Sequence, residues 1–176
     1  MNLTYLIVEL RKKISNLGIS AQKGLGKELF EFLSSLTPIV NVDLLVYNDK
    51  SQFLLSRRND PYSGCGWHVP GGCIRFRETI DGRLRKTALQ ELGLIEFKYN
   101  KDPIKVFEIF SNEKRDIANQ DERAHFISIV YKCYVPFSYS LNNEGKQESD
   151  AGFLKWFYKL PEDFLDIQQC YKEILP

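Results

Sequence analysis

Apolar residues recur every three or four positions in two segments near the start of the chain. The first segment, 3–16, is followed by Gly18, and the second, 22–36, is followed by a Thr-Pro pair. This spacing places apolar side chains on one helix face, and Gly and Pro end helices. The pattern therefore predicts two amphipathic helices. The first needs an apolar partner, which we expect to be the rest of the domain or a second subunit.

From position 39 onward the pattern becomes that of β-strands. Residues 39–47 and 52–57 are rich in β-branched and aromatic residues and flank a polar turn, which predicts a hairpin. Further strands are predicted at 67–72, 97–99, 105–110, 125–135 and 153–158. The helices that this part of the chain predicts are 79–92, closed by Gly93, and one that begins near 160. Strands interspersed with helices indicate an α+β fold around a mixed sheet, and the polar segment 111–124 is predicted to be a mobile loop.

Length and charge limit the classes of protein to which this chain could belong. The chain has 176 residues, which predicts one domain (38–176) with a small helical extension (1–37). With 24 Lys+Arg and 23 Asp+Glu, it gives no reason to expect a nucleic-acid partner. The sequence lacks both a secretory signal and an apolar run long enough to cross a membrane. Because its four cysteines are scattered, we expect a cytoplasmic protein without disulfides.

The segment 72–94 carries the chemistry. It reads as a strand that ends in glycine, a loop containing Glu78, and a helix whose last turns present Thr87, Gln90 and Glu91 on one face. A carboxylate that faces a backbone turn supplies hard oxygen ligands together with the turn carbonyl. This arrangement predicts a site for a divalent cation.

This segment resembles the box of the Nudix hydrolase family, G-x5-E-x7-R-E-U-x-E-E-x-G-U, where U is a bulky aliphatic residue. The positions that match in register are Gly72, Glu78, Glu91, Gly93 and Leu94. The positions that depart are Lys86 for Arg, Thr87 and Gln90 for Glu, and Ala88 for U. Because the spacing is intact over 23 residues, the signal is specific. The resemblance implies a Nudix-type α/β/α sandwich and a hydrolase that uses Mg²⁺, with Mn²⁺ as the alternative.

The replacement of two helical glutamates by Thr87 and Gln90 resembles the pattern in one branch of the family, the GDP-mannose mannosyl hydrolases. The segments 37–43, 53–58 and 67–72 also resemble that branch, and the likeness covers roughly residues 25 to 165. By position, the resemblance implies that the Gly71 carbonyl and Glu91 bind the metal, with Gln147 as the best match for a third ligand. It also implies a homodimer.

The same resemblance implies substrate contacts. By position, Asp43 and Arg58 contact a nucleoside diphosphate sugar, and Lys86, which stands where the box has Arg, is a third candidate. Arg58 could equally be a solvated strand end, because surface arginines are common. Asp43 lies between apolar neighbours, and an unpaired buried carboxylate is costly, so a functional role is favoured for it.

The candidates for the general base differ from those of the branch. The branch carries a histidine beside its late-loop glutamine, but residues 141–156 contain none. Glu148 follows Gln147 and is therefore the predicted base, with Asp150 in reserve. His125 opens a strand and is a further candidate, although a histidine there is more often structural. His68 is a weaker candidate, and its neighbours Cys65 and Cys73 lack the second pair that a zinc site would need.

Three functions stay open at this point. One helical carboxylate suits one Mg²⁺ whose shell the substrate diphosphate completes, which favours hydrolysis of a nucleoside diphosphate sugar at its anomeric carbon. The second is attack on phosphorus of a nucleoside triphosphate or another nucleoside diphosphate compound. The third is a nucleotide-binding domain that has lost turnover. Basic residues predominate in 57–86 and acidic residues in 144–166, which suits a diphosphate and its cation.

Overall fold

The computed structural model describes residues 2–61, 63–110, 125–136 and 138–176, so the loop predicted at 111–124 lies outside it. Within these ranges, eight strands form one sheet. The strands are β1 (Ile39–Tyr47), β2 (Phe53–Asp60), β3 (Gly64–His68), β4 (Gly71–Cys73), β5 (Lys98–Tyr99), β6 (Lys105–Phe110), β7 (His125–Tyr134) and β8 (Leu154–Phe157). The helices are α1 (Leu3–Asn16), α2 (Lys27–Ser34), α3 (Ile80–Leu92) and the 3₁₀ helix η1 (Asp166–Glu173).

Strand β1 is the centre of the sheet. It pairs in parallel with β7 and antiparallel with β2 and β4. Strands β3 and β8 add to β2, while β5 and β6 add to β7, all of them antiparallel. The predicted mixed sheet is therefore confirmed. The pairing of β1 with β4 places Asp43 opposite Gly71, so two predicted site residues meet although 28 positions separate them in the sequence.

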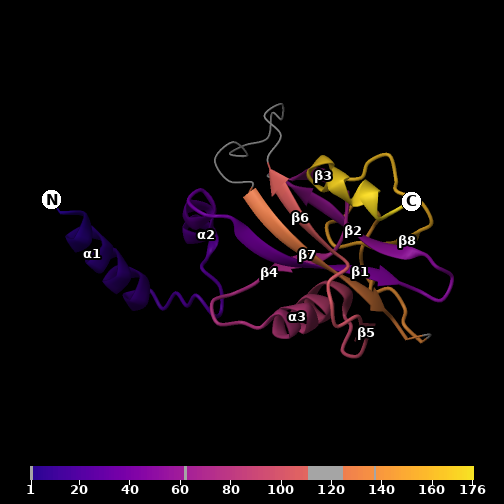
Figure 1. Cartoon of the computed structure of the whole chain (residues 1–176), viewed down its shortest axis with the longest axis horizontal. Helices are drawn as coiled ribbons and strands as arrows, with labels where there is room; N and C mark the ends of the chain where they lie inside the picture. The colour runs from indigo at the N-terminus through magenta and orange to yellow at the C-terminus, as the bar shows by residue number, and fades with distance from the viewer. Residues whose placement is uncertain (1, 62, 111–124, 137) are drawn as a thin grey trace.

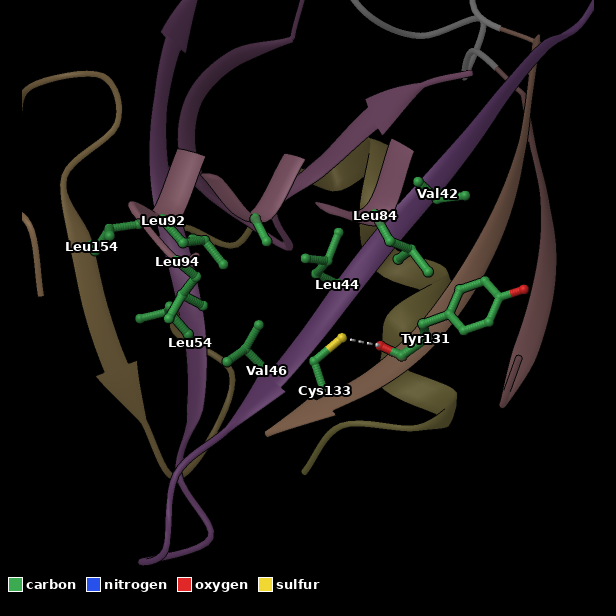
Figure 2. Close-up of a cluster of buried hydrophobic side chains, with 11 residues drawn as sticks. Val42, Leu44, Val46, Leu54, Leu84, Leu92, Leu94, Tyr131, Cys133 and Leu154 are labelled. Atoms are coloured by element: carbon green, nitrogen blue, oxygen red, sulfur yellow. Dashed lines mark hydrogen bonds between the residues drawn. The ribbon is translucent and has the colours of Figure 1, made fainter. Parts of the chain in front are cut away.

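Alternate residues of β1 serve two different cores, because successive side chains of a strand point to opposite faces. Val42 and Leu44 pack with Leu84 of α3 in a cluster that Figure 2 shows between the helix and the sheet. Leu45 belongs to a second cluster with Tyr171 of η1. Figure 1 shows α3 and η1 on opposite faces of the sheet. This arrangement is the predicted α/β/α sandwich.

Helix α3 begins and ends where its local sequence requires. Thr79 is its N-cap, and the Thr79 Oγ1 atom accepts a hydrogen bond of 3.0 Å from the Gly82 N–H. Gly93 follows the last turn with a φ of 66°, a left-handed conformation in which glycine carries no steric penalty. The predicted helix at 79–92 is thus confirmed, with its first residue serving as the cap. These two ends fix Glu91 in the final turn.

The N-terminal helices follow the predicted pattern in part. Helix α1 spans the predicted residues, whereas α2 is shorter than the predicted 22–36, because Gly24 and Gly26 adopt positive φ angles before it. No residue of α1 is buried, and Figure 1 shows the helix standing away from the sheet. The part of the domain that the structure describes is therefore not the apolar partner predicted for α1. Among the described residues, no helix is long and apolar enough to cross a membrane.

The end of the chain differs in kind from its prediction. The helix predicted to begin near 160 is a 3₁₀ helix that begins at Asp166. Before it, the backbone N–H of Leu165 donates to the Trp67 carbonyl oxygen, and Trp67 N–H donates to the Asp163 carbonyl oxygen. These hydrogen bonds hold the segment against β3. As a result η1 lies across the sheet face that carries Asp43.

Candidate functional site

A cavity lies beside η1 and also reaches the last turn of α3. Its walls come from α2, the strands β1 to β4, β6 and β7, the last turn of α3, and η1. Its large apolar lining residues are Phe30, Val69, Ile109, Phe126 and Ile167. Its charged or titratable side chains are Asp43, Arg58, Asp60, His68, Cys73 and Glu91. Sequence-distant strands and helices therefore bring apolar and polar side chains to one cavity.

Asp43 lies at the buried end of this cavity, with 3% of its surface exposed. Its Oδ2 atom accepts a hydrogen bond of 2.5 Å from the hydroxyl group of Tyr171, and Ser128 provides another. Burial raises the pKa of Asp43 to about 6, although these two hydrogen bonds oppose the rise. The carboxyl group is thus held in a fixed orientation by two hydrogen bonds.

Glu91 and Gly71 meet beside Asp43. The Glu91 carboxylate accepts a hydrogen bond from the backbone N–H of Gly71. Glu91 keeps an exposed surface toward the cavity, yet the protein around its carboxyl group raises its pKa to about 7 by desolvation, and Asp43 adds to that rise while Arg58 opposes it. A Cβ at Gly71 would collide with the Asp43 carboxylate. Only glycine at this position therefore lets two carboxyl groups approach the same strand end.

Arg58 brings positive charge to the same cavity. Its Nε atom lies 2.6 Å from Oδ2 of Asp60, and 45% of its side chain is exposed. The guanidinium group lowers the pKa of both Asp43 and Glu91 by charge attraction. An exposed arginine with acidic neighbours can turn toward a phosphate oxygen when one is present.

The imidazole of His68 is a neutral group in the wall. Its Nδ1 atom lies 2.8 Å from the backbone carbonyl oxygen of Ser56, and because a carbonyl oxygen only accepts, we assign the proton to Nδ1. Burial lowers the pKa of His68 to about 3, with help from Arg58. The ring is therefore uncharged at neutral pH.

The first glutamate of the 72–94 segment belongs to a different arrangement, which we name the Glu78 cluster (Glu78, Arg83, Lys86 and the backbone N–H of Arg75). Glu78 Oε2 accepts from Arg83 Nε at 2.8 Å and from Arg75 N–H at 2.9 Å, and Lys86 Nζ donates to Oε1 at 2.8 Å. Burial opposes ionisation of Glu78, but the bonds from Lys86 and Arg75 prevail and lower its pKa to about 2. This glutamate ties the loop to α3.

Thr87 and Gln90 stand where the Nudix box has glutamates. The Thr87 side chain is buried, and a Cβ at Gly72 would come within 2.6 Å of its Oγ1 atom. Gln90 is exposed and does not line the cavity. Within the described residues, Glu91 is thus the carboxylate that α3 presents to the cavity.

The structure brings together four of the predicted site residues, Asp43, Arg58, Gly71 and Glu91. The other five are not among the described residues that line the cavity; they are Lys86, His125, Gln147, Glu148 and Asp150. Their roles stay predictions.

The present contacts of these five residues are local. Lys86 pairs with Glu78, as described above. Gln147 N–H donates to Asp150 Oδ2 at 2.8 Å, and Glu148 Oε1 lies 2.7 Å from Lys155 Nζ. His125 Nε2 lies 3.2 Å from Glu108 Oε1.

Sequence reasoning missed the contribution of the C-terminal segment. Tyr171 reaches Asp43, and the Gln168 side chain accepts from the Val69 N–H at 2.7 Å while lining the cavity. Periodicity near 160–173 indicates only a helix, because it carries no information on which strand that helix covers. Phe30 was missed for the same reason, since its place on the apolar face of α2 is also that of an ordinary core residue.

The described residues provide part of a cation site. Glu91, Asp43 and the backbone at Gly71 offer the hard oxygen atoms that Mg²⁺ and Mn²⁺ prefer. No group of three or more His, Cys, Asp or Glu side chains gathers around one point in the described ranges. The residues therefore fit a cation that also takes oxygen ligands from its substrate.

Comparison with known proteins gives a consistent result. The chain is 27% identical over 151 residues to the ADP-ribose pyrophosphatase of Methanocaldococcus jannaschii. The aligned region covers 85% of this chain and 80% of that protein. It is 35% identical over 65 residues to the low-salt glycan biosynthesis protein Agl8 of Haloferax volcanii, which covers 37% of this chain and 41% of that one.

A solved structure with the same fold is the MutT NUDIX hydrolase of Burkholderia pseudomallei. Its TM-score is 0.55 at 17% identity, and the match covers 78% of this chain and 98% of that one. At this identity the likeness concerns the fold alone. The family model that matches is the NUDIX domain, over residues 37–170. The predicted hydrolase is thereby confirmed, and the chain belongs to the NUDIX domain family.

Proposed function

We propose that this protein is a Mg²⁺-dependent hydrolase of a nucleoside diphosphate sugar, which releases the free sugar and the nucleoside diphosphate. The observation that carries the proposal is the single helical carboxylate at the cavity. Thr87 is buried against Gly72 and Gln90 faces solvent, so α3 offers Glu91 alone. One carboxylate supports one cation better than the several that activate water for attack on phosphorus.

The residues that would hold the cation are Gly71, through its carbonyl group, and Glu91, with Gln147 as the predicted third ligand. A bound Mg²⁺ would neutralise charge on the departing diphosphate. Gln147 now lies in an exposed loop, so its part in the site requires that loop to move toward the cavity. GDP-mannose is the substrate that the family resemblance suggests first.

The chain's own residues would do the rest. In the proposed reaction, a water oxygen bonds to the anomeric carbon, the bond from that carbon to the β-phosphate oxygen breaks, and its electron pair leaves with the diphosphate. Arg58 would bind the diphosphate, and the fixed carboxylate of Asp43 would orient the sugar. Glu148 would take the proton of the water, with Asp150 or His125 as the alternatives.

A second function is supported by a specific observation. The relative that aligns with most of this chain is named an ADP-ribose pyrophosphatase. A related activity here would place the attacking water on phosphorus and release a nucleoside monophosphate and a sugar phosphate. Both functions use the same class of substrate, a nucleoside diphosphate joined to a sugar.

One assay separates them. We would incubate the full chain and Mg²⁺ with a panel that includes GDP-mannose and ADP-ribose in ¹⁸O-labelled water. Label in the free sugar supports attack at carbon, and label in a phosphate product supports attack at phosphorus. A panel in which no compound is hydrolysed, with either Mg²⁺ or Mn²⁺, would overturn both.

We also infer a homodimer. The support from this chain is that α1 carries large apolar residues on its exposed surface, among them Leu3, Ile7 and Leu10. An exposed amphipathic helix gains stability when a partner covers its apolar face. Light scattering on the purified chain should give twice the monomer mass of 20.5 kDa, and a monomer mass at micromolar concentration would contradict the inference.

A further inference from the structure

Hydrogen-bond acceptors lie at the buried end of the cavity. Asp43 presents its carboxyl group there, and Glu91 lines the same cavity from the last turn of α3. The hydrogen-bonding groups of two other wall residues are engaged: the Ser128 hydroxyl group bonds to Asp43, and the Gln168 amide bonds to both the N–H and the carbonyl oxygen of Val69. Asn41, Ser63 and Arg58 also line the cavity and carry donors, so a ligand meets both donors and acceptors, and Asp43 supplies acceptor atoms at the buried end.

His68 adds a further acceptor to the cavity, where Arg58 and Asp60 are its charged neighbours. Its side chain lines the cavity while only 8% of the residue's surface is exposed. Because Nδ1 carries the proton that binds the Ser56 carbonyl oxygen, Nε2 holds a free lone pair. Within the described residues, no hydrogen bond to Nε2 is present, and the atom is not sealed from solvent. The tautomer is fixed by the sheet, so this lone pair is available before any ligand arrives.

Acceptor atoms at Asp43 and His68 discriminate between the two ends of a nucleoside diphosphate sugar. A diphosphate carries no hydrogen-bond donor at neutral pH and would be repelled by the Asp43 carboxylate, whereas at Glu91 the proposed cation would intervene. Sugar hydroxyl groups donate hydrogen bonds and are uncharged. Arg58, the basic side chain among the described lining residues, has 45% of its side chain exposed and suits the diphosphate.

We propose that Nε2 of His68 accepts a hydrogen bond from a sugar hydroxyl group, which makes the part of the cavity that His68 lines the sugar subsite. The proposal rests on the proposed function, because it assigns one part of that substrate to one part of that site. It makes His68 a specificity-determining residue that contacts the sugar directly. The role is distinct from that of Glu91, which would act at the diphosphate.

Two substitutions separate this role from a structural one. In His68→Asn, the side-chain N–H₂ can still donate to the Ser56 carbonyl oxygen, but the acceptor in the Nε2 position is lost. In His68→Gln, the longer amide can place an acceptor where Nε2 was, but it loses the bond to Ser56. A purely structural histidine would therefore tolerate Asn better than Gln, whereas a sugar contact would tolerate Gln better than Asn.

The measurement compares two probes in the presence of Mg²⁺. These are the best nucleoside diphosphate sugar of the panel, through its KM, and the same nucleoside diphosphate without sugar, through its inhibition constant. We expect His68→Asn to raise the KM about three- to ten-fold, the value of one neutral hydrogen bond, and to leave the inhibition constant within about two-fold. His68→Gln should keep the KM near that of the wild type while melting at a lower temperature.

Two results would overturn the inference. Equal weakening of both probes by His68→Asn would mean that the residue does not sense the sugar. A KM raised by His68→Gln but not by His68→Asn would assign His68 a structural role. If no panel compound is hydrolysed, the same two probes are compared by calorimetric binding, so that a failed proposed function still leaves the sugar subsite open to test.

Discussion

Two glutamates at opposite ends of α3 have opposite surroundings. Glu78 lies before the helix and receives hydrogen bonds from Arg83, Lys86 and a backbone N–H, which hold its pKa near 2. Glu91 lies in the last turn with one backbone N–H as its donor, and desolvation raises its pKa to about 7. The two residues match the same sequence box and are 13 positions apart.

The difference shows how glutamate can serve a structural role at one end of a helix and be available for chemistry at the other. The charge of Glu78 is already neutralised by its own chain, so that carboxylate stabilises the loop and has little capacity left for a ligand. The charge of Glu91 is only partly compensated, and its environment would gain from a cation. The following predictions test this contrast, beginning with the largest expected effect.

Replacement of Glu91 should affect activity far more than stability. Glu91→Gln removes the carboxylate that α3 presents to the cavity, so we expect the Mg²⁺-dependent kcat/KM to fall about 100-fold or more. The melting temperature at pH 8 should stay the same or rise, because a poorly compensated charge is removed. Glu96→Gln, in an exposed glutamate beyond Gly93, is the matched control and should leave both unchanged. Undiminished activity in Glu91→Gln would refute the metal assignment.

Replacement of Glu78 should show the reverse. Only 7% of its side chain and 9% of the Arg83 side chain are exposed, so Glu78→Gln leaves a buried guanidinium without its counter-charge. We expect the free energy of unfolding to fall by about 3 kcal/mol, as measured by urea denaturation. The activity of the remaining folded protein should drop less than in Glu91→Gln. A stability within about 0.5 kcal/mol of the wild type would show that the Glu78 cluster contributes little.

The two glutamates should also shift stability in opposite pH ranges. The pKa of Glu78 in the folded protein lies below its ordinary value of 4.5. Its stabilising contribution to the free energy of unfolding is therefore present above pH 4.5 and is lost as the pH falls toward 2. The pKa of Glu91 in the folded protein lies above 4.5. Its stabilising contribution to the free energy of unfolding is therefore present below pH 4.5 and is lost as the pH rises toward 7.

Glu91 therefore gives a measurable pH effect. Without divalent cations, the wild type should lose about 1 kcal/mol of unfolding free energy relative to Glu91→Gln between pH 5 and pH 8, a value kept small by solvent screening at the cavity. Urea titrations of both proteins at the two pH values provide the measurement. A difference that does not change with pH would show that the Glu91 carboxyl group titrates normally.

The smallest effect is expected at Lys86. Its side chain is 56% exposed and is one of several donors to Glu78, so Lys86→Gln should cost about 0.5 kcal/mol of unfolding free energy. The same variant tests the predicted substrate contact, since a raised KM would support it and an unchanged KM would leave Lys86 to the Glu78 cluster alone. A loss as large as that of Glu78→Gln would contradict the ranking of the two residues.

Much of the fold could be predicted because its signals are local. The strand at 39–47 and the helix at 79–92 follow from periodicity and caps, which depend on neighbours within a few positions. Helix α2 was predicted too long, since the apolar stripe continued through Gly24 and Gly26 although their backbone leaves the helical region. The 3₁₀ form of η1 was not predictable from its apolar spacing.

The predictions of site residues also differ between regular elements and loops. Gly71, Glu91, Asp43 and Arg58 were named from sequence position and all line the cavity, because they lie on or next to regular elements whose register the sequence fixes. Gln147, Glu148 and Asp150, predicted as third ligand and base, lie in a loop where no regular element positions a side chain. Their placement depends on contacts that the local sequence does not encode.

By itself, the sequence determined the box of 72–94, the family that it resembles and the identity of the helical carboxylate, because these depend on residue type and short-range spacing. Only the tertiary structure decided that Tyr171 holds Asp43, that His68 keeps a free lone pair in the wall, and that Glu78 is neutralised while Glu91 is not. The reason is physical: the protonation and orientation of a buried group depend on which distant groups fold against it.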